Sequence, residues 1–323
     1  MPRHLRREAW VALTLGVLCG VLALIRPEYF ARGHLVELFL ANLPVLVIAA
    51  GMTLVMLAGD IDISVGSVFA VCAVTSGLLA KAGVPTPVVF LSVGIMGAAI
   101  ASVSGVLVAY LRLPSIVVTL AMMIALRDAL RWATQGAWVQ DLPAGFQWLG
   151  LSQRMYPLAA GAFAAALMAG LGWGLRFAAA GRLLYATGSN ADAARLAGID
   201  TSRVRMSAFA CLGALTGLAA MLNAMRFNQI PANTGLGLEL KVIAAVVVGG
   251  TAITGGRGTL VGTLLGVALL GAIGPALTFL GVSAYWERAI QGGIILVAVA
   301  AEKFPRRSDA QAARATHFDA THA

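Results

Sequence analysis

Long runs of apolar residues, separated by short polar segments, extend along almost the whole chain. Windows of about 20 residues without charge recur, and this is the length that an α-helix needs to cross the hydrocarbon core of a bilayer. The pattern predicts an all-α integral membrane protein, a polytopic bundle of about ten transmembrane helices. We place the spans at residues 9–25, 38–58, 64–80, 88–110, 115–132, 157–176, 207–225, 240–253, 259–280 and 285–301.

An acidic segment at residues 59–67 interrupts the apolar run and predicts a broken or turned region there. Carboxylates and helix breaks at membrane depth are unfavourable unless they line a path or hold a specific partner. In an extended break, Asp60 and Asp62 would share one side and face a common path with Ser64. Alternatively, the two aspartates cap the following span, with Ser64 at its N-cap position. Both interpretations stay open at this point.

The composition supports a single membrane domain. Hydrophobic residues make up 59% of the chain and charged residues 11%, whereas a soluble domain carries about a quarter. The mean hydropathy is +0.87. We expect a transmembrane domain at residues 1–301 and a disordered cytoplasmic tail at residues 302–323.

The net charge of +9 raises the question of nucleic-acid binding. The basic residues lie at the ends of spans and are not clustered with aromatic residues, so the positive-inside rule explains them better. An uncleaved first span and an even number of spans place both the N-terminus and the C-terminus in the cytoplasm.

A second notable segment, residues 181–200, falls in a basic cytoplasmic loop. Ser189 followed by Asp192 resembles a helix start, and Gly198 is a natural helix stop. An alanine-rich helix of this length is unstable alone, so it is expected to dock on a partner surface or on the span ends. Another segment, residues 249–262, is dense in glycine and predicts close helix packing around a tight turn.

Several chemistries are excluded by what the sequence lacks. No Gly-x-x-x-x-Gly-Lys-Ser/Thr motif occurs, so no phosphate-binding ATP loop is present in this chain. The four histidines lie outside span centres, and Cys19, Cys72 and Cys211 show no paired spacing. We therefore expect no catalytic residue, no metal site and no cofactor in this chain, and no enzyme activity of its own.

The three segments at 58–67, 181–199 and 246–259, in this order, give the chain a family resemblance. It resembles the permease subunits of bacterial ATP-binding-cassette (ABC) importers for monosaccharides, the ribose/xylose/rhamnose-type branch, with rhamnose or autoinducer-2 importers favoured within it. One departure is Gly59-Asp60, where relatives often carry Gly-Gly. This departure leaves Asp62 as the family acid and Asp60 as the less certain member of the pair.

The resemblance implies a set of partners. These are a second permease subunit (identical or a sister chain), two cytoplasmic subunits that bind ATP and Mg²⁺, a periplasmic sugar-binding protein and the lipid of the bacterial inner membrane. The resemblance also makes residues 188–199 the helix that couples the permease to the ATPase. Its expected members are Gly188, Asn190, Ala194, Arg195 and Gly198.

We therefore expect the chain to translocate a monosaccharide by alternating access along a path lined by Asp60, Asp62, Ser64 and Asn223. An alternative hypothesis is a stand-alone secondary transporter, coupled to protons through Asp60 and Asp62. The two hypotheses differ in their energy source, which is ATP in the first and the proton gradient in the second.

Overall fold

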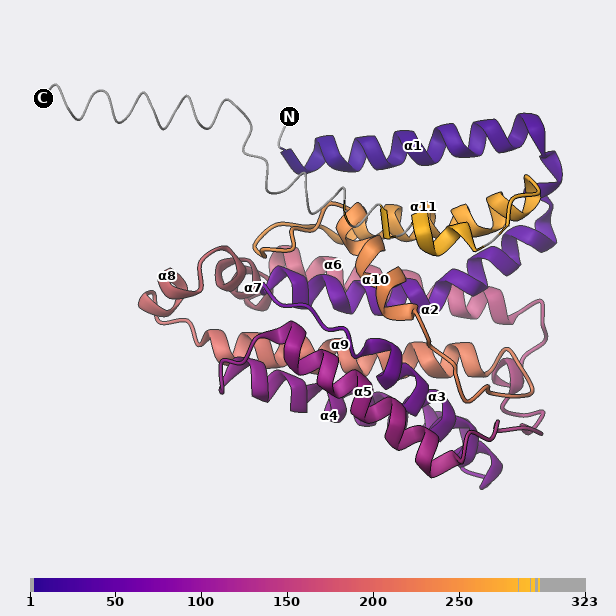
Figure 1. The fold of residues 1–323 in the computed structure, drawn as a ribbon, viewed down its shortest axis with the longest axis horizontal. Helices are drawn as coiled ribbons and strands as arrows, with labels where there is room; N and C mark the ends of the chain where they lie inside the picture. Colours follow the sequence, from indigo (N-terminus) through magenta and orange to yellow (C-terminus); the bar gives the residue numbers. More distant parts are fainter. Residues whose placement is uncertain (1–2, 284, 291, 294–295, 297–323) are drawn as a thin grey trace, which may run out of the picture.

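The computed structural model describes residues 3–283, 285–290, 292–293 and 296. Within this part of the chain all regular elements are helices (Figure 1). The elements are α1 (Arg3–Ile25), η1 (Pro27–Phe30), α2 (Arg32–Leu57), α3 (Val65–Lys81), α4 (Thr86–Ala109), α5 (Ser115–Thr134), η2 (Gln147–Gly150), α6 (Tyr156–Phe177), α7 (Ala179–Ser189), α8 (Ala191–Leu196), α9 (Thr201–Ala224), α10 (Leu238–Val248) and α11 (Leu260–Phe279).

The all-α membrane fold predicted from the sequence is confirmed. Each of the first nine predicted spans coincides with a helix, while most of the tenth, 285–301, and the whole tail, 302–323, lie outside the described residues. Six of the described helices, α1, α2, α4, α6, α9 and α11, are long and apolar enough to cross a membrane. Helices α3 and α10 are shorter, at 17 and 11 residues.

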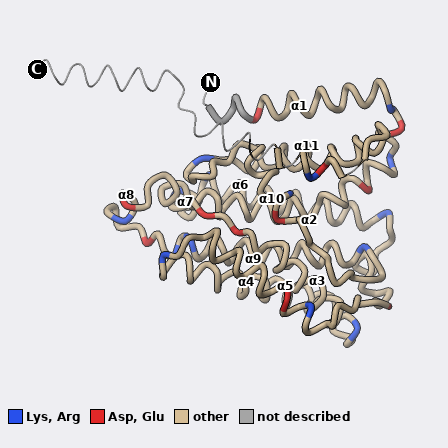
Figure 2. Tube along the Cα trace, in the orientation of Figure 1, with Lys and Arg blue, Asp and Glu red and all other residues tan. Residues whose placement is uncertain are grey.

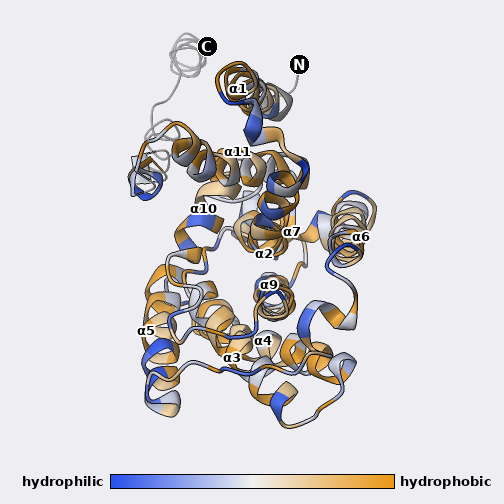
Figure 3. Ribbon diagram, turned by 90° about the vertical axis from the view of Figure 1, so that its right-hand side faces the viewer, coloured by the Kyte–Doolittle hydropathy of each residue, from blue (hydrophilic) through white to orange (hydrophobic). Residues whose placement is uncertain are grey.

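The helices surround two central members, α2 and α9. Helix α9 packs against α2, α3 and α4, and α2 also packs against α10 and α11. The view along the bundle in Figure 3 places α1, α5 and α6 at its margin. Only 6% of the apolar window of α1 is buried, against 78% for α2, so most of the apolar surface of α1 is exposed in this chain. Lys, Arg, Asp and Glu gather mainly toward the two ends of the bundle (Figure 2).

The bundle contains two units that each consist of a helix, a non-helical break and a second helix. Helix α2 runs toward the end that carries α8, the chain doubles back through residues 58–64, and α3 runs away from that end (Figure 1). Helix α9 runs away from the α8 end, residues 225–237 double back, and α10 runs toward it. We call residues 58–64 the first re-entrant segment and residues 225–237 the second. The two units are therefore oppositely directed, as in transporters built from inverted repeats.

Small residues allow the long helices to approach closely. A Cβ atom on either Gly97 of α4 or Gly213 of α9 would collide with the carbonyl oxygen of the other residue. Gly217 meets the Val93 carbonyl oxygen in the same way. Because lipid tails are as apolar as leucine, close van der Waals packing of this kind is a principal attraction between membrane helices. The close α4–α9 crossing therefore depends on glycine at these positions.

Candidate functional site

The first re-entrant segment buries both acidic residues of the 59–67 motif. Asp60 is 5% exposed and Asp62 is 1% exposed. The Asp62 Oδ1 atom accepts hydrogen bonds from the Ser64 backbone N–H at 2.7 Å and from the Ser64 hydroxyl at 2.6 Å. Ser64 occupies the N-cap position of α3, as one interpretation expected, but its side chain donates to Asp62 and accepts nothing from the helix. Asp62 therefore closes the turn that starts α3.

Asp60 is held by a different helix. Its Oδ2 atom lies 3.3 Å from Nε of Arg205, which is on the second turn of α9. Both side chains are largely withdrawn from solvent, and their charges compensate each other where neither would be stable alone. The ion pair ties the first re-entrant segment to the part of α9 that directly follows α8.

Helix α5 provides hydrogen-bonding partners for the backbone of this segment, from residues that are spaced four apart along one face of the helix. The Ser115 hydroxyl accepts from the Ile61 N–H at 3.4 Å, and the Thr119 hydroxyl accepts from the Ile63 N–H at 3.1 Å. One and two helical turns further on, the Met123 carbonyl accepts from the Ser67 hydroxyl, and Arg127 donates to the Thr234 carbonyl at 2.9 Å. Non-helical backbone at membrane depth is stable only with such partners.

The two units cross where Gly66 meets Gly235. A Cβ on Gly66 would lie 2.6 Å from the Gly235 carbonyl oxygen, and one on Gly235 would lie 2.5 Å from the Gly66 carbonyl oxygen. Glu239, in the first turn of α10, is buried beside this crossing, and its Oε1 atom accepts from the Gly237 N–H at 3.2 Å. The starts of α3 and α10 therefore lie together inside the bundle, where their helix dipoles favour electron-rich ligand atoms.

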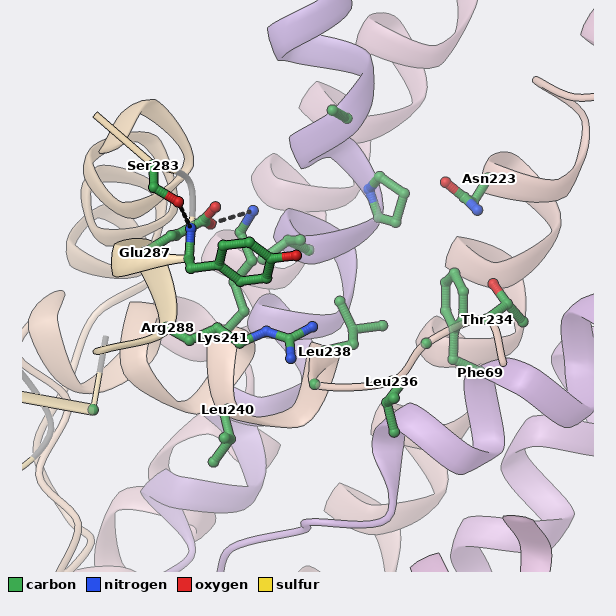
Figure 4. Close-up of a pocket in the computed structure, with 17 residues that line it drawn as sticks. Phe69, Asn223, Thr234, Leu236, Leu238, Leu240, Lys241, Ser283, Glu287 and Arg288 are labelled. Carbon is green, nitrogen blue, oxygen red and sulfur yellow. Dashed lines mark hydrogen bonds and ion pairs between the residues drawn. The ribbon is translucent and has the colours of Figure 1, made fainter. Parts of the chain in front are cut away.

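A cavity of about 730 Å³ opens beside the crossing (Figure 4). Asn223, Thr234 and Phe69 lie together on one side of it, and Lys241, Glu287 and Arg288 lie on the other. Lys241 Nζ is 3.7 Å from Glu287 Oε1. The remaining lining residues are Ala41, Pro44, Val45, Gly235, Leu236, Gly237, Leu238, Leu240, Ser283, Tyr285 and Gly292. The cavity is thus mainly apolar, with a few amide, hydroxyl and charged groups.

A second cavity, of about 240 Å³, shares Asn223 and Thr234 with the first. It is bordered by the loop that follows α9, including the amides of Asn228 and Gln229. Asn223 and Thr234 therefore stand between the two cavities and present hydrogen-bonding groups to both.

The predicted path residues fall in two separate places. Asn223 lines both cavities, whereas Asp60, Asp62 and Ser64 line neither of the two and bond to protein groups in this structure. That these three residues face a transport path stays a prediction.

The predicted short helix beyond Ser189 exists, but its start is different. Helix α8 begins at Ala191, and its N-cap is Asn190, whose side chain accepts from the N–H groups of Asp192 at 3.1 Å and Ala193 at 3.0 Å. The expected Ser189 start was wrong because the preceding residues continue as α7 through Ser189. An amide oxygen at Asn190 caps as well as a hydroxyl does.

Other members of the predicted coupling helix have defined contacts. Gly198 adopts a left-handed conformation, with φ of 82°, after α8 ends, which agrees with the predicted helix stop. Ala194 is buried. The Arg195 guanidinium donates through Nε to the Thr201 hydroxyl at 2.9 Å and pairs with Asp192 at 3.3 Å. Arg195 therefore joins α8 to the first residue of α9.

Gly188 lies in a crowded junction of three chain segments. A Cβ on Gly188 would overlap the Leu57 carbonyl oxygen and lie 2.6 Å from the Gly256 nitrogen. The Gly256 N–H donates to that same Leu57 carbonyl at 3.0 Å. A Cβ on Gly255 would lie 2.8 Å from Gly59 Cα. The end of α2, the end of α7 and the α10–α11 loop therefore meet backbone to backbone, and we call this contact the glycine junction.

Tyr185 of α7 adds a side-chain contact to the same loop. Its hydroxyl donates to the Gly258 carbonyl at 2.8 Å. Burial raises the pKa of the Tyr185 hydroxyl above its usual range, so the group stays a protonated donor at physiological pH.

Sequence reasoning missed Arg205, Thr234 and Lys241 as site residues. A signal for Lys241 was available, because a lysine within an apolar span is rare and usually functional. Arg205 and Thr234 gave no local signal, since each gains its role from segments distant in the sequence. Among the described residues, no group of three or more His, Cys, Asp or Glu side chains is placed to hold a metal ion.

Comparison with protein families identifies the class. Residues 35–299 match the family of permease components of branched-chain amino acid transport systems, and the chain belongs to this permease family. It is the membrane-spanning permease subunit of an ABC importer and thus a transport component. The alternative of a stand-alone proton-coupled transporter finds no support in these comparisons.

Two proteins similar to this chain are permeases of the autoinducer 2 import system. The chain is 37% identical to the autoinducer 2 import system permease protein LsrC of Salmonella typhi over 290 residues, which are 90% of this chain and 84% of the relative. It is 36% identical to LsrC of Escherichia coli over 293 residues, or 91% of this chain and 85% of the relative. No solved structure shows significant similarity to the chain.

Proposed function

We propose that this permease imports a small, hydroxyl-rich molecule of the monosaccharide type, with autoinducer-2 as the favoured case. The cavity between the two oppositely directed units carries this proposal. Its volume of about 730 Å³ falls in the usual range of small-molecule sites. Amide and hydroxyl groups at Asn223, Thr234 and Ser283 suit the hydroxyl groups of such a substrate.

The proposed path runs through both cavities and passes Asn223 and Thr234. Mainly apolar walls with few polar groups hold a polar substrate weakly, and weak binding lets a transporter release its cargo. Asp60, Asp62 and Ser64, predicted to face the path, would in this proposal shape the chain that leads into α3 and so support the cavity wall.

The proposed orientation places the α8 end of the bundle in the cytoplasm and the smaller cavity toward the periplasm. Helix α1 begins at the α8 end (Figure 1), and the chain around α7 and α8 is rich in arginine, which favours the cytoplasmic side. The described arginines between residues 176 and 206 are Arg176, Arg182, Arg195, Arg203 and Arg205.

The proposed assembly contains two copies of this chain, or this chain with a sister chain, in the bacterial inner membrane. Two cytoplasmic subunits would bind ATP and Mg²⁺ and dock on α8, and a periplasmic binding protein would deliver the substrate. The support is the family membership and the exposed, capped α8. Helix α8 spans only six residues, and so short a helix gains from a docking surface.

Reconstitution tests this function. In liposomes that contain the permease, its ATPase and its binding protein, we expect ATP-dependent accumulation of labelled autoinducer-2 and no accumulation by this chain alone. An Asn223→Leu variant is expected to lower uptake about tenfold, because a hydrogen-bonding group of the path becomes apolar. The matched control is Asn233→Leu at an exposed position of the second re-entrant segment, outside the lining of both cavities. Concentrative uptake by the lone chain would overturn the proposal.

A further inference from the structure

The first re-entrant segment is held from two sides by the elements that flank α8. Gly188, near the end of α7, meets the end of α2 just before α8 begins. Arg205, near the start of α9, pairs with Asp60 just after α8 ends. A displacement of α8 therefore reaches the residues around Asp60 along both flanks.

The α7 contact is stiff because it is made by backbone. Gly188 packs under the Leu57 carbonyl, which also accepts the Gly256 N–H at 3.0 Å, and no flexible side chain lies between them. Close-packed atoms transmit displacement, since protein interiors are dense and poorly compressible.

The α9 contact is a chain of polar links. Arg195 of α8 donates to the Thr201 hydroxyl at 2.9 Å, and Thr201 is the first residue of α9. One turn further along α9, Arg205 holds Asp60 at 3.3 Å. Movement of α8 is thus passed to the Asp60 carboxylate through only one turn of α9.

From Asp60 the connection continues to the cavity. Asp62 and Ser64 close the turn that starts α3, Gly66 meets the second re-entrant segment at Gly235, and Phe69 lines the cavity. A shift of the first re-entrant segment therefore moves the start of α3 and, with it, one wall of the cavity.

We propose that the Asp60–Arg205 ion pair and the Gly188–Leu57 contact form a two-point linkage that carries movement of α7 and α8 to the cavity wall. The inference rests on the proposed function, because it requires an ATPase that docks on α8. Asp60 and Arg205 act here as positioning residues: they touch the moving segments and not the substrate.

A double-mutant cycle tests the linkage. In the reconstituted complex, we expect Asp60→Asn and Arg205→Gln each to lower the amount of substrate moved per ATP hydrolysed about tenfold, an effect within the range for residues in contact. The double variant is expected to be no worse than either single variant, because both remove the same link. Independent, additive losses would overturn the proposal, since they would place Asp60 in a separate role such as path lining.

The structure offers a matched control pair at the start of α9, where Arg203 is in the first turn and Asp200 is the N-cap. Arg203 Nε lies 2.9 Å from Asp200 Oδ2, but these side chains are 79% and 50% exposed. Arg203→Gln is expected to leave the transport-to-hydrolysis ratio unchanged. Melting temperature and complex assembly are measured for every variant. A loss of stability with an unchanged ratio would show that the Asp60–Arg205 pair is merely structural, and would also overturn the proposal.

A measurement that needs no substrate tests this inference separately from the proposed function. In a complex whose Cys19, Cys72 and Cys211 are replaced by Ala, a Phe69→Cys probe is labelled with a maleimide. We expect ATP to change the labelling rate, and Asp60→Asn to abolish that change. An ATP-dependent change that survives in Asp60→Asn would overturn the linkage. A wild-type complex that shows the labelling change but moves no autoinducer-2 would instead contradict the proposed substrate and leave the linkage supported.

Discussion

Gly66 and Gly235 approach each other too closely to accommodate a side chain on either residue. A Cβ on Gly66 would lie 2.6 Å from the Gly235 carbonyl oxygen, and one on Gly235 would lie 2.5 Å from the Gly66 carbonyl oxygen. Gly235 also has a φ of 72°, a conformation that side chains disfavour. The crossing of the two helix–break–helix units therefore depends on glycine at both positions.

Gly66→Ala is expected to destabilise the permease by about 2–3 kcal/mol, the size of effect seen when a well-packed core is overfilled. The added methyl group would also collide with the buried Glu239 carboxylate. Thermal unfolding in detergent measures the change. Gly170→Ala in α6, where a Cβ meets nothing within 4 Å, is the control and is expected to keep wild-type stability. Equal stability of both variants would contradict the close crossing.

Asp62→Ala is expected to destabilise the fold by about 1–3 kcal/mol, because it leaves the buried Ser64 N–H and hydroxyl without their acceptor. Ser64→Ala removes only one of these two donors, so we expect a smaller loss. Denaturation midpoints of the two variants give the comparison. A greater loss in Ser64→Ala would show that Asp62 is not the main support of this turn.

Tyr185→Phe is expected to lower stability by about 1 kcal/mol through loss of the hydrogen bond to Gly258. Burial raises the pKa of Tyr185 in the folded state, so at pH values above the ordinary tyrosine pKa of about 10 the unfolded state releases the proton more readily. The stability advantage of wild type over Tyr185→Phe should thus be constant near neutral pH and shrink above about pH 10. Melting curves across this range test the sign.

Asn190→Ala is expected to fray α8, because the Asp192 and Ala193 N–H groups lose their acceptor, a change of about 1 kcal/mol in helix stability. Weaker binding of the ATPase subunit in a pull-down titration is the expected result, with the permease still inserted and folded. Asn190→Asp retains a capping oxygen and is the matched control. Unchanged ATPase affinity in Asn190→Ala would argue against α8 as the docking element.

The helices were predictable from the sequence because the bilayer itself sets their length and composition. Nine predicted spans coincide with helices, although the runs at 64–80 and 240–253 become α3 and α10, which start inside the bundle. Hydropathy shows which segments are apolar, but it does not show whether a segment crosses the whole membrane. A break was predicted at residues 59–67 from its polar residues and glycines, and the structure has it at residues 58–64, because α3 already begins at Val65.

The partners of the site residues were not predictable from local pattern. Asp60 pairs with Arg205, and Gly188 meets Leu57, across long stretches of chain that only the folded bundle brings together. The start of α8 was misplaced because local capping patterns do not reveal that α7 continues through Ser189. Asn223 was predictable as a polar residue near a span end, but its position between two cavities depends on the second re-entrant segment.

Pairs of glycines bring some helices into direct backbone contact, and these helices are held together more rigidly than the rest of the bundle. Gly97 and Gly213 fasten α4 to α9, and Gly249 and Gly262 fasten α10 to α11 in the same way. Helices fastened by their backbones cannot slide without breaking many contacts at once. Relative movement of the α4–α9 pair and the α10–α11 pair is therefore expected at the non-helical residues 225–237, which join α9 to α10. We therefore expect these two helix pairs to move as rigid bodies joined by the second re-entrant segment.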